Sequence, residues 1–211
     1  MAYIHIPLGG DCSVAYQLQL HGIRTASWPF DWCRCSITQL VECLLNDFQK
    51  FSNFEIVASS SVHPEIDEAG NLLSGGSYIV KNGYGMHLAH ELTDLRKLEV
   101  YRGRIGERIA RFQMALSNSA SSIHFIRKEN GKIKKSYMEH LAKLLSLLPG
   151  HCILTLVVHT SSAELLDSVA TQYNSRLRIV YYQEFEADWH APSIDWTSIF
   201  ALPESPEQPA P

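Results

Sequence analysis

Residues Cys152-Ile153-Leu154-Thr155-Leu156-Val157-Val158 decide the fold class of this chain. The run is almost continuously apolar, which is the pattern of a strand buried on both faces in a parallel sheet. It is flanked by helical patterns over 134–148 and 161–173 and, beyond them, by apolar strands at 122–127 and 177–182. The order is strand, helix, strand, helix, strand, and the crossovers are long enough for parallel pairing.

The first half of the chain adds shorter elements. We expect strands at 3–8 and 84–90 (the second after an Asn82-Gly83 turn), helices at 12–21, 36–46 and 100–117, and a looser region over 52–83. Together the two halves predict an α/β fold, a single domain over residues 1–200 with a mainly parallel, Rossmann-like sheet and flanking helices. Residues 201–211 are Pro-rich and are expected to form a disordered tail.

Composition limits the possible functions. Of the 211 residues 45% are hydrophobic and 19% charged, so the chain can bury a large core and is not disordered as a whole. The net charge of −4 gives no support for nucleic-acid binding. There is neither a signal peptide nor an apolar stretch of about 18 residues, so we expect no membrane association. The five cysteines lack the spacing of a disulfide framework, which indicates reduced thiols and a cytoplasmic protein.

Cys12 is the first candidate for chemistry. It follows the strand at 3–8 and a Gly9-Gly10 turn, and it stands where the next helix begins. Unpaired backbone N–H groups and the positive end of the helix dipole favour a thiolate there, and thiolate is the nucleophilic form of cysteine. The glycines permit a sharp turn and the close approach of a substrate. The alternative is a packing role, because buried inert cysteines are common.

Other polar side chains follow the predicted strands where each strand ends. They are His90, Arg127, His159 and the segment Asp188-Trp189-His190. In an open parallel sheet ligands bind beyond the carboxyl ends of the strands, so we expect these residues on the same edge as Cys12. Arg127 and His159 are therefore candidates for substrate binding. For Arg127 the alternative is an ion pair with a nearby carboxylate.

Residues 22–32 form a second unusual segment, Gly-Ile-Arg-Thr-Ala-Ser-Trp-Pro-Phe-Asp-Trp. Its aromatic side chains bury large apolar areas and are expected to hold Asp31 in place. A carboxylate fixed in this way suits the orientation of a histidine or the binding of a substrate hydroxyl. Arg24, Trp28 and Trp32 are candidates for substrate contacts. The alternative is a loop packed on the core, with Asp31 capping the next helix.

These motifs resemble a family from bacteria and large DNA viruses that is described as papain-like cysteine peptidases. The family pattern is a Leu-Gly-x-x-Cys turn, a Gly-Leu-Arg-like step and a Pro-Phe-Asp-Trp loop, then a histidine beside an acidic residue and an arginine-rich helix. The matching residues are Leu8-Gly9-Gly10-Asp11-Cys12, Gly22-Ile23-Arg24, Pro29-Phe30-Asp31-Trp32, His90-Glu91 and Arg102, Arg104, Arg108 and Arg111. The resemblance covers roughly residues 1–130.

The resemblance implies a Cys12 nucleophile and a His90 base. In such a pair the thiol proton moves to the imidazole and the thiolate attacks an acyl carbon. Asp31, or the adjacent Glu91, is expected to fix the tautomer of the histidine. Backbone N–H groups at Cys12 and Ser13 are expected to hold the oxyanion.

Two features of the histidine segment bear on this interpretation. His87 and His90 face opposite sides of a regular strand, so we expect only one of them, His90, in the site. Papain-like enzymes carry the histidine on an antiparallel sheet, whereas the second half of this chain predicts a parallel one. We take the fold from the periodicity, because one fold can host many chemistries.

Two other functions fit the sequence. The Gly-Asp-Cys turn with Asp188 and His190 after the last strand resembles the layout of serine esterases, with cysteine in place of serine and without their Asp-x-x-His spacing. A non-catalytic α/β module would instead bind a glycan or a phosphorylated ligand at Arg24 and the Trp28–Trp32 loop.

The remaining expectations concern ligands. No paired Cys-x-x-Cys, His-x-x-x-His, Walker or Gly-x-Gly-x-x-Gly motif is present, so we expect no metal and no cofactor. The substrate class is a peptide, an acyl group or a glycan-linked acyl group. The sequence names neither a single substrate nor an oligomeric state.

Overall fold

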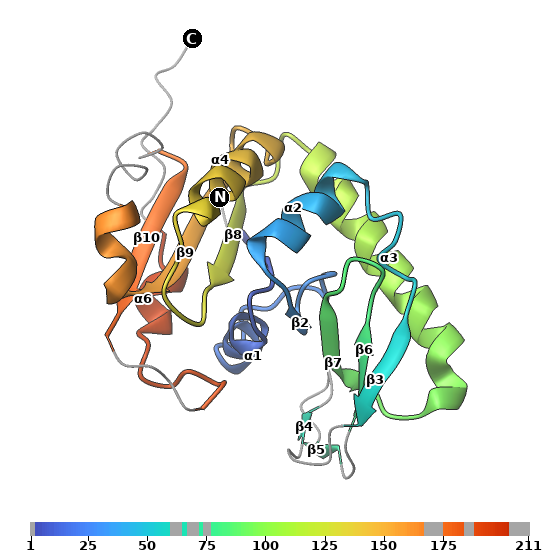
Figure 1. Cartoon of the computed structure of the whole chain (residues 1–211). Coiled ribbons are helices and arrows are strands. Elements are labelled where there is room, and N and C mark those ends of the chain that lie inside the picture. The colour runs from blue at the N-terminus through green and yellow to red at the C-terminus, as the bar shows by residue number, and fades with distance from the viewer. Residues whose placement is uncertain are drawn as a thin grey trace.

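Two four-stranded sheets organise the chain (Figure 1). The computed structural model describes residues 3–59, 65–66, 72–73, 77–166, 175–183 and 188–202. One sheet is parallel and lies on the left in Figure 1, and the other is antiparallel and lies on the right.

The parallel sheet is the one that the apolar run at 152–158 predicts. Its strands are β1 (Ile4–Pro7), β8 (Ile123–Lys128), β9 (Ile153–His159) and β10 (Leu177–Tyr182), in the order β1-β8-β9-β10. All three pairings are parallel, and every residue of β8 is buried. The predicted α/β fold with a parallel sheet and flanking helices is therefore confirmed.

Helices cover both faces of this sheet. Residues of α1 (Ser13–Leu20) and α6 (Trp196–Phe200) share an apolar cluster with Ile126 and Val157. Leucines of α4 (Ser136–Leu147) belong to the larger cluster that includes Phe125 and Leu156. Since neighbouring side chains of a strand point to opposite faces, α1 and α6 lie on one face and α4 on the other.

The antiparallel sheet was not predicted. Its strands are β2 (Cys33–Arg34), β7 (His87–Leu92), β6 (Tyr78–Lys81) and β3 (Glu55–Ser59), in the order β2-β7-β6-β3. They are short, and both the β3–β6 and the β6–β7 pairs contain a shift in register. Such strands lack the sustained alternation that identifies a strand in sequence, which is why 52–83 was expected to be a looser region. The two short strands β4 (Glu65–Ile66) and β5 (Leu72–Leu73) pair with each other.

The predicted strand at 84–90 begins three residues late. The Asn82 side chain accepts hydrogen bonds from the backbone N–H groups of Tyr84 (3.0 Å) and Met86 (3.1 Å), which closes a turn between β6 and β7. The strand therefore starts at His87.

Two further helices join the sheets into one unit. The long helix α3 (Leu98–Ser117), preceded by the short 3₁₀ helix η1 (Leu95–Lys97), runs along the antiparallel sheet, and α2 (Ile37–Leu45) packs against α4 (Figure 1). Ser36 and Gln39 form a capping box that starts α2. One apolar cluster contains Phe112 of α3, Leu40 of α2 and Phe125 of β8, so the two halves share a core.

The helices expected at 12–21, 36–46, 100–117 and 134–148 are all present. The start of the helix expected at 161–173 is seen as η2 (Thr160–Ser162) and residues 163–166, and its remainder lies outside the described residues, as do residues 203–211 of the expected tail. Within the described part of the chain, no helix has the length and apolar character needed to cross a bilayer.

Candidate active site

The turn that leads to Cys12 accepts only glycine. Gly9 and Gly10 have φ values of +67° and +92°, a region that favours glycine. A Cβ on Gly9 would lie 2.5 Å from the Cys35 Sγ, and one on Gly10 would lie 2.0 Å from the Lys128 carbonyl oxygen. The backbone thus passes against β2 and the end of β8 and delivers Cys12 to the N-cap of α1, as the sequence predicts.

Asp11 fixes the start of α1. Its Oδ1 accepts hydrogen bonds from both the backbone N–H (2.9 Å) and the hydroxyl of Ser13, and its Oδ2 lies 2.7 Å from the Lys128 Nζ. Asp11 and Lys128 are both buried, so the pair ties the turn to the end of β8. The Ser13 N–H is engaged by Asp11, and the oxyanion-binding role expected of the Cys12 N–H stays a prediction.

A cavity of about 750 Å³ opens beside Cys12. Ligand pockets are typically about 300–1,000 Å³, so it has the size of a substrate cleft. The residues that line it come from both halves of the molecule: Gly10, Cys12, Trp32, Arg34, Cys35, Ser36, Gln39, Ile79, Gly85, His87, Ala89, His90, Glu129 and Asn130. The structure therefore brings Cys12 and His90 to one cavity, although they are 78 positions apart (90 − 12) in the chain.

His90 reaches the cavity because β7 is irregular. Tyr78 pairs with Leu92, and Val80 pairs with Leu88. Between these two pairs β7 advances by four residues while β6 advances by two, so β7 contains a bulge. His90 has a φ of +76°, and its backbone N–H donates to the Ser77 Oγ (3.0 Å). A non-glycine residue in this conformation is strained by about 1–3 kcal/mol, and such strain clusters at functional sites. The expectation that only one histidine enters the site was wrong, because His87, Ala89 and His90 all line the cavity.

Two indole rings contact the imidazole of His90. The ring of Trp32 is centred 5.4 Å away and that of Trp189 5.2 Å away. Trp189 also contacts Tyr16, which lies one turn after Cys12 on α1, with ring centres 5.3 Å apart. A segment from the end of the chain therefore packs against both the helix of the cysteine and the strand of the histidine.

This combination of a cysteine on a helix and a histidine on an antiparallel sheet agrees with the comparisons with known proteins. The profile of a family described as "Putative papain-like cysteine peptidase (DUF1796)" matches residues 3–160. The chain belongs to this family. An uncharacterised protein of Acanthamoeba polyphaga mimivirus is 28% identical over 216 aligned positions, which cover 93% of this chain and 96% of the viral protein. No solved structure matches the chain significantly.

Arg24, Trp28 and Asp31, the other candidate residues of segment 22–32, do not line the cavity. Asp31 is fully buried and pairs with Arg24, and it also accepts the backbone N–H of Trp28 (2.9 Å). Burial raises the pKa of Asp31, and the Arg24 guanidinium opposes that effect. Trp28 is buried as well. Of the candidate residues in this loop, Trp32 is the one that lines the cavity. The substrate contacts expected of Arg24 and Trp28, and the orienting role expected of Asp31, stay predictions.

Glu91, considered above as a residue that fixes the tautomer of His90, forms an ion pair with Arg108. Its carboxylate oxygens lie 2.5 and 2.7 Å from the two terminal nitrogens of Arg108 on α3, and both side chains are nearly buried. The pair anchors the irregular part of β7 to α3, directly beside His90.

Arg127 contacts residues that line the cavity, among them Cys35 and Glu129, but does not line it itself. The Arg127 guanidinium is fully buried and donates to the carbonyl oxygens of Leu8 (2.7 Å) and Cys35 (2.8 Å), so it joins β1 to the chain after β2. His159 lies 2.8 Å from the Gln183 carbonyl oxygen through its Nε2. Neither lines the cavity, and their expected roles in substrate binding stay predictions.

The Asp188–His190 pair of the esterase-like alternative does form. His190 Nδ1 lies 2.5 Å from Asp188 Oδ1, and the imidazole contacts the Tyr16 ring at 4.4 Å between centres. His190 does not line the cavity that contains Cys12, so the structure places His90, and not His190, at the shared site.

Cys35 is the cavity residue that the sequence did not suggest. Hydrogen bonding to Cys33, the nearby Arg127 guanidinium and the Gly10 N–H lower the pKa of Cys35 to about 6, against the effect of burial. Cys35 directly follows β2, and in extended backbone the Cys33-Arg34-Cys35 spacing places both thiols on the same side. Nothing in the sequence indicates that Arg127, 92 positions away, faces them. In the part of the chain that the structure describes, no three His, Cys, Asp or Glu residues form a metal-binding group.

Proposed function

We propose that this protein is a cysteine-dependent hydrolase, a papain-like peptidase or a related acyl hydrolase or transferase, in which Cys12 is the nucleophile and His90 the base. The observation that carries the proposal is the shared cavity, lined by a thiol at the start of α1 and by an imidazole from the antiparallel sheet. The glycine turn, the Asp11–Lys128 pair and the bulge of β7 are the features that hold these two groups in place.

The reaction would proceed through a thioester. His90 takes the proton of the Cys12 thiol, and the thiolate attacks the acyl carbon of the substrate. The backbone N–H of Cys12 donates to the oxyanion that forms. The imidazolium of His90 then returns the proton to the leaving group, and a water molecule activated by His90 hydrolyses the thioester.

Asp31 has a positioning role in this proposal. Its ion pair with Arg24 and its bond to the Trp28 N–H fix the loop that ends in Trp32, and the Trp32 ring contacts His90. Asp31 would thus orient the imidazole through the loop.

The test is the rate at which iodoacetamide labels each cysteine between pH 5 and 9, resolved by tryptic peptides. Trypsin cuts after Arg24 and Arg34, so Cys12, Cys33 and Cys35 fall in three different peptides, and Cys43 shares the peptide of Cys35, so that its own rate is read in the Cys35→Ala variant. A reactive Cys12 should label at about pH 6, below the pKa of about 8.5 of an ordinary thiol. We expect His90→Ala to slow Cys12 by at least about a hundredfold, the lower end of the range for general-base catalysis.

His87→Ala is the matched control, because His87 lines the same cavity from the same strand. Cys35→Ala removes the second acidic thiol from the measurement. If Cys12 labels no faster than Cys43 and Cys152, the hydrolase proposal is wrong, and a non-catalytic module that binds a ligand in this cavity becomes the better interpretation. If His190→Ala slows Cys12 and His90→Ala does not, the base is His190.

A further inference from the structure

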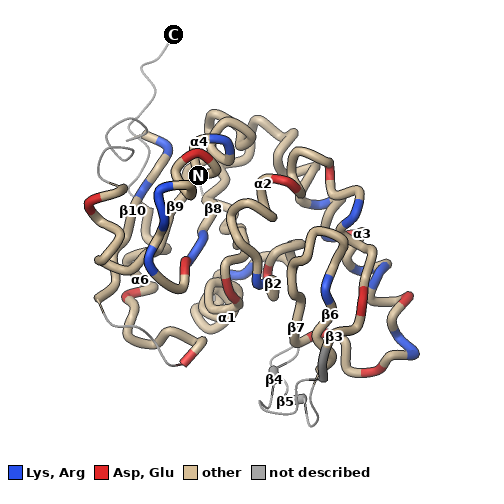
Figure 2. The backbone as a smooth tube through the Cα atoms, viewed as in Figure 1, with Lys and Arg blue, Asp and Glu red and all other residues tan. Residues whose placement is uncertain are grey.

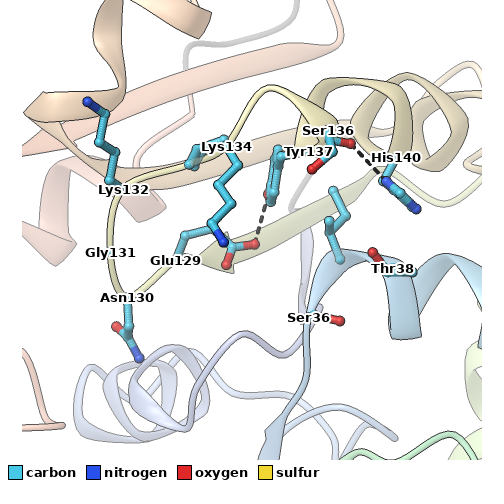
Figure 3. A pocket seen from close by; sticks show the side chains of 12 residues that line it. Ser36, Thr38, Glu129, Asn130, Gly131, Lys132, Lys134, Ser136, Tyr137 and His140 are labelled. Carbon is cyan, nitrogen blue, oxygen red and sulfur yellow. Dashed lines mark hydrogen bonds between the residues drawn. The ribbon is translucent and has the colours of Figure 1, made fainter.

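A second cavity adjoins the proposed catalytic cleft. Its volume is about 270 Å³, and it lies between the start of α2 and the loop that leads from β8 to α4 (Figure 3). Ser36, Glu129 and Asn130 line both cavities, so the two meet at these residues. This volume lies just below the range of about 300–1,000 Å³ that is typical of pockets for whole ligands, and it suits one substrate side chain.

The loop on one side of this cavity is held rigidly. The backbone N–H of Glu129 donates to the Val157 carbonyl oxygen (2.9 Å), and its carbonyl oxygen accepts from the Tyr182 hydroxyl (2.7 Å). Further along, Ile133 is buried and its N–H donates to the Ser162 Oγ (3.1 Å). The loop is therefore anchored at both ends, which fixes the positions from which Lys132 and Lys134 extend.

The charge of the cavity is positive. Its only acidic lining residue is Glu129, whose Oε1 lies 2.5 Å from the buried Arg127 Nε and accepts from the Tyr137 hydroxyl (2.8 Å). Arg127 thus compensates the charge of Glu129. Lys132 and Lys134 both line the cavity, but in Figure 3 the Lys134 side chain extends toward this space and that of Lys132 extends away from it. The Lys134 ammonium has no ion-pair partner among the residues that the structure describes.

Hydroxyl groups complete the walls. Ser36 and Thr38 lie on the opposite side, at the start of α2, and Ser136 begins α4 (Figure 3). The Ser36 hydroxyl donates to the Gln39 Oε1 (3.2 Å), so the groups that suit a carboxylate are the Lys134 ammonium and the hydroxyls of Thr38 and Ser136. A basic cavity on a chain of net charge −4 is a local feature, and Figure 2 shows the lysines of the 132–135 segment gathered on this loop.

We propose that this cavity is a subsite of the catalytic cleft that binds an acidic side chain of the substrate, with Lys134 as the residue that determines specificity. The inference rests on the proposed function, because it assigns the substrate class of that cleft. The expected substrates are acidic peptides with a glutamate or aspartate within a few residues of the scissile bond.

The experiment measures the binding of two fluorescent decapeptides to the full-length Cys12→Ala protein by anisotropy in 0.15 M salt. One peptide alternates alanine with glutamate and the other alanine with glutamine, so that any register presents an acidic or a neutral side chain to the subsite. We expect the glutamate peptide to bind at least about tenfold more tightly, the effect of one charge pair near a protein surface. The net charge of the protein opposes this preference, so it cannot arise from the protein's overall field.

Lys134→Gln should abolish the preference for glutamate. Lys135→Gln is the matched control, since it makes the same change of charge at the neighbouring position without touching the lining of the cavity, and it should retain most of the preference. The glutamate peptide should also protect Cys12 of the wild-type protein from iodoacetamide. Equal binding of the two peptides, equal losses in the two lysine variants, or binding without protection of Cys12 would each overturn the subsite.

The two proposals fail separately. If Cys12 labels fast in a manner that depends on His90 and the two peptides bind equally, the subsite falls and the hydrolase stands. If Cys12 is inert and the glutamate peptide still binds through Lys134, the hydrolase falls, and the cavity is supported as an acidic-peptide site without catalysis.

Discussion

The two sheets of this molecule hold their functional groups in opposite ways. The parallel half presents Cys12 from regular structure, because a buried strand, a glycine turn and a helix start follow one another without irregularity. The antiparallel half presents His90 from a distortion, a bulge in a short strand with a left-handed backbone. In the proposed enzyme the position of the nucleophile Cys12 thus depends on close backbone packing at the glycine turn. The position of the base His90 depends on a strained backbone conformation that neighbouring contacts must stabilise.

This difference predicts that the antiparallel half loses most when one charge is removed. Arg108→Met leaves the nearly buried Glu91 without its partner, and breaking such a pair costs about 3–5 kcal/mol of unfolding free energy. Urea unfolding measures this cost. The double variant Glu91→Leu/Arg108→Met should recover a large part of it, because no buried charge is left unpaired. A cost below about 1 kcal/mol, the range of surface pairs, would show that the bulge does not depend on this ion pair.

The parallel half is expected to be most sensitive at Gly10. Gly10→Ala combines a strained φ with a Cβ only 2.0 Å from the Lys128 carbonyl oxygen, so we expect a loss of about 2–4 kcal/mol in urea unfolding. Gly106→Ala on α3 is the control, because nothing lies within 4 Å of the added Cβ and alanine favours a helix by about 0.5–1 kcal/mol. Equal effects of the two substitutions would contradict the packing argument.

A smaller effect, again in the parallel half, concerns acid. His124 on β8 is buried, with its Nδ1 2.9 Å from the His5 Nδ1 and its Nε2 2.7 Å from the Thr155 Oγ1. Burial and the nearby His5 lower the pKa of His124 to about 2. In the unfolded chain this histidine takes up its proton near pH 6.5, so the unfolded state binds more protons below that pH and stability falls as the pH falls.

We expect His124 to account for a loss of about 2 kcal/mol between pH 6.5 and 4.5, close to one proton over two pH units. The slope of unfolding free energy against pH should be measured for the wild type and for His124→Gln, in which this contribution should disappear. An unchanged slope in the variant would assign the acid sensitivity to other groups.

The parallel half could be predicted better than the antiparallel half, because its strands are regular and those of the antiparallel sheet are short and irregular. The strands β8, β9 and β10 were predicted within about two residues at each end, because burial on both faces produces continuous apolar runs. The helix start at Cys12 was visible in the glycine turn, and the helix expected at 36–46 does begin after Ser36, where the structure shows a capping box. Of the antiparallel strands only β7 was predicted. The two residues of β2, for example, are too few to show a pattern in the sequence.

The candidate site divides in the same manner. Cys12, His90 and Trp32 are signalled by their motifs, and the structure places all three at one cavity. Cys35 and the second cavity beside Lys134 depend on contacts between distant segments, such as Arg127 with Cys35, that leave no local pattern. The bulge that brings both His87 and His90 to the cavity also leaves no pattern in the sequence. Nothing in the residues around His90 indicates that its backbone is left-handed.

Trp189 has a consequence for how this family should be delimited. The family profile ends at residue 160, before β10 and before the residues of α6 that pack on α1, the helix that begins at Cys12. Trp189 itself covers one side of His90. The stretch that the family profile matches is thus shorter than the stretch that forms the cavity and its surroundings, and a truncation or fusion designed at residue 160 would keep every motif while removing Trp189 from beside His90.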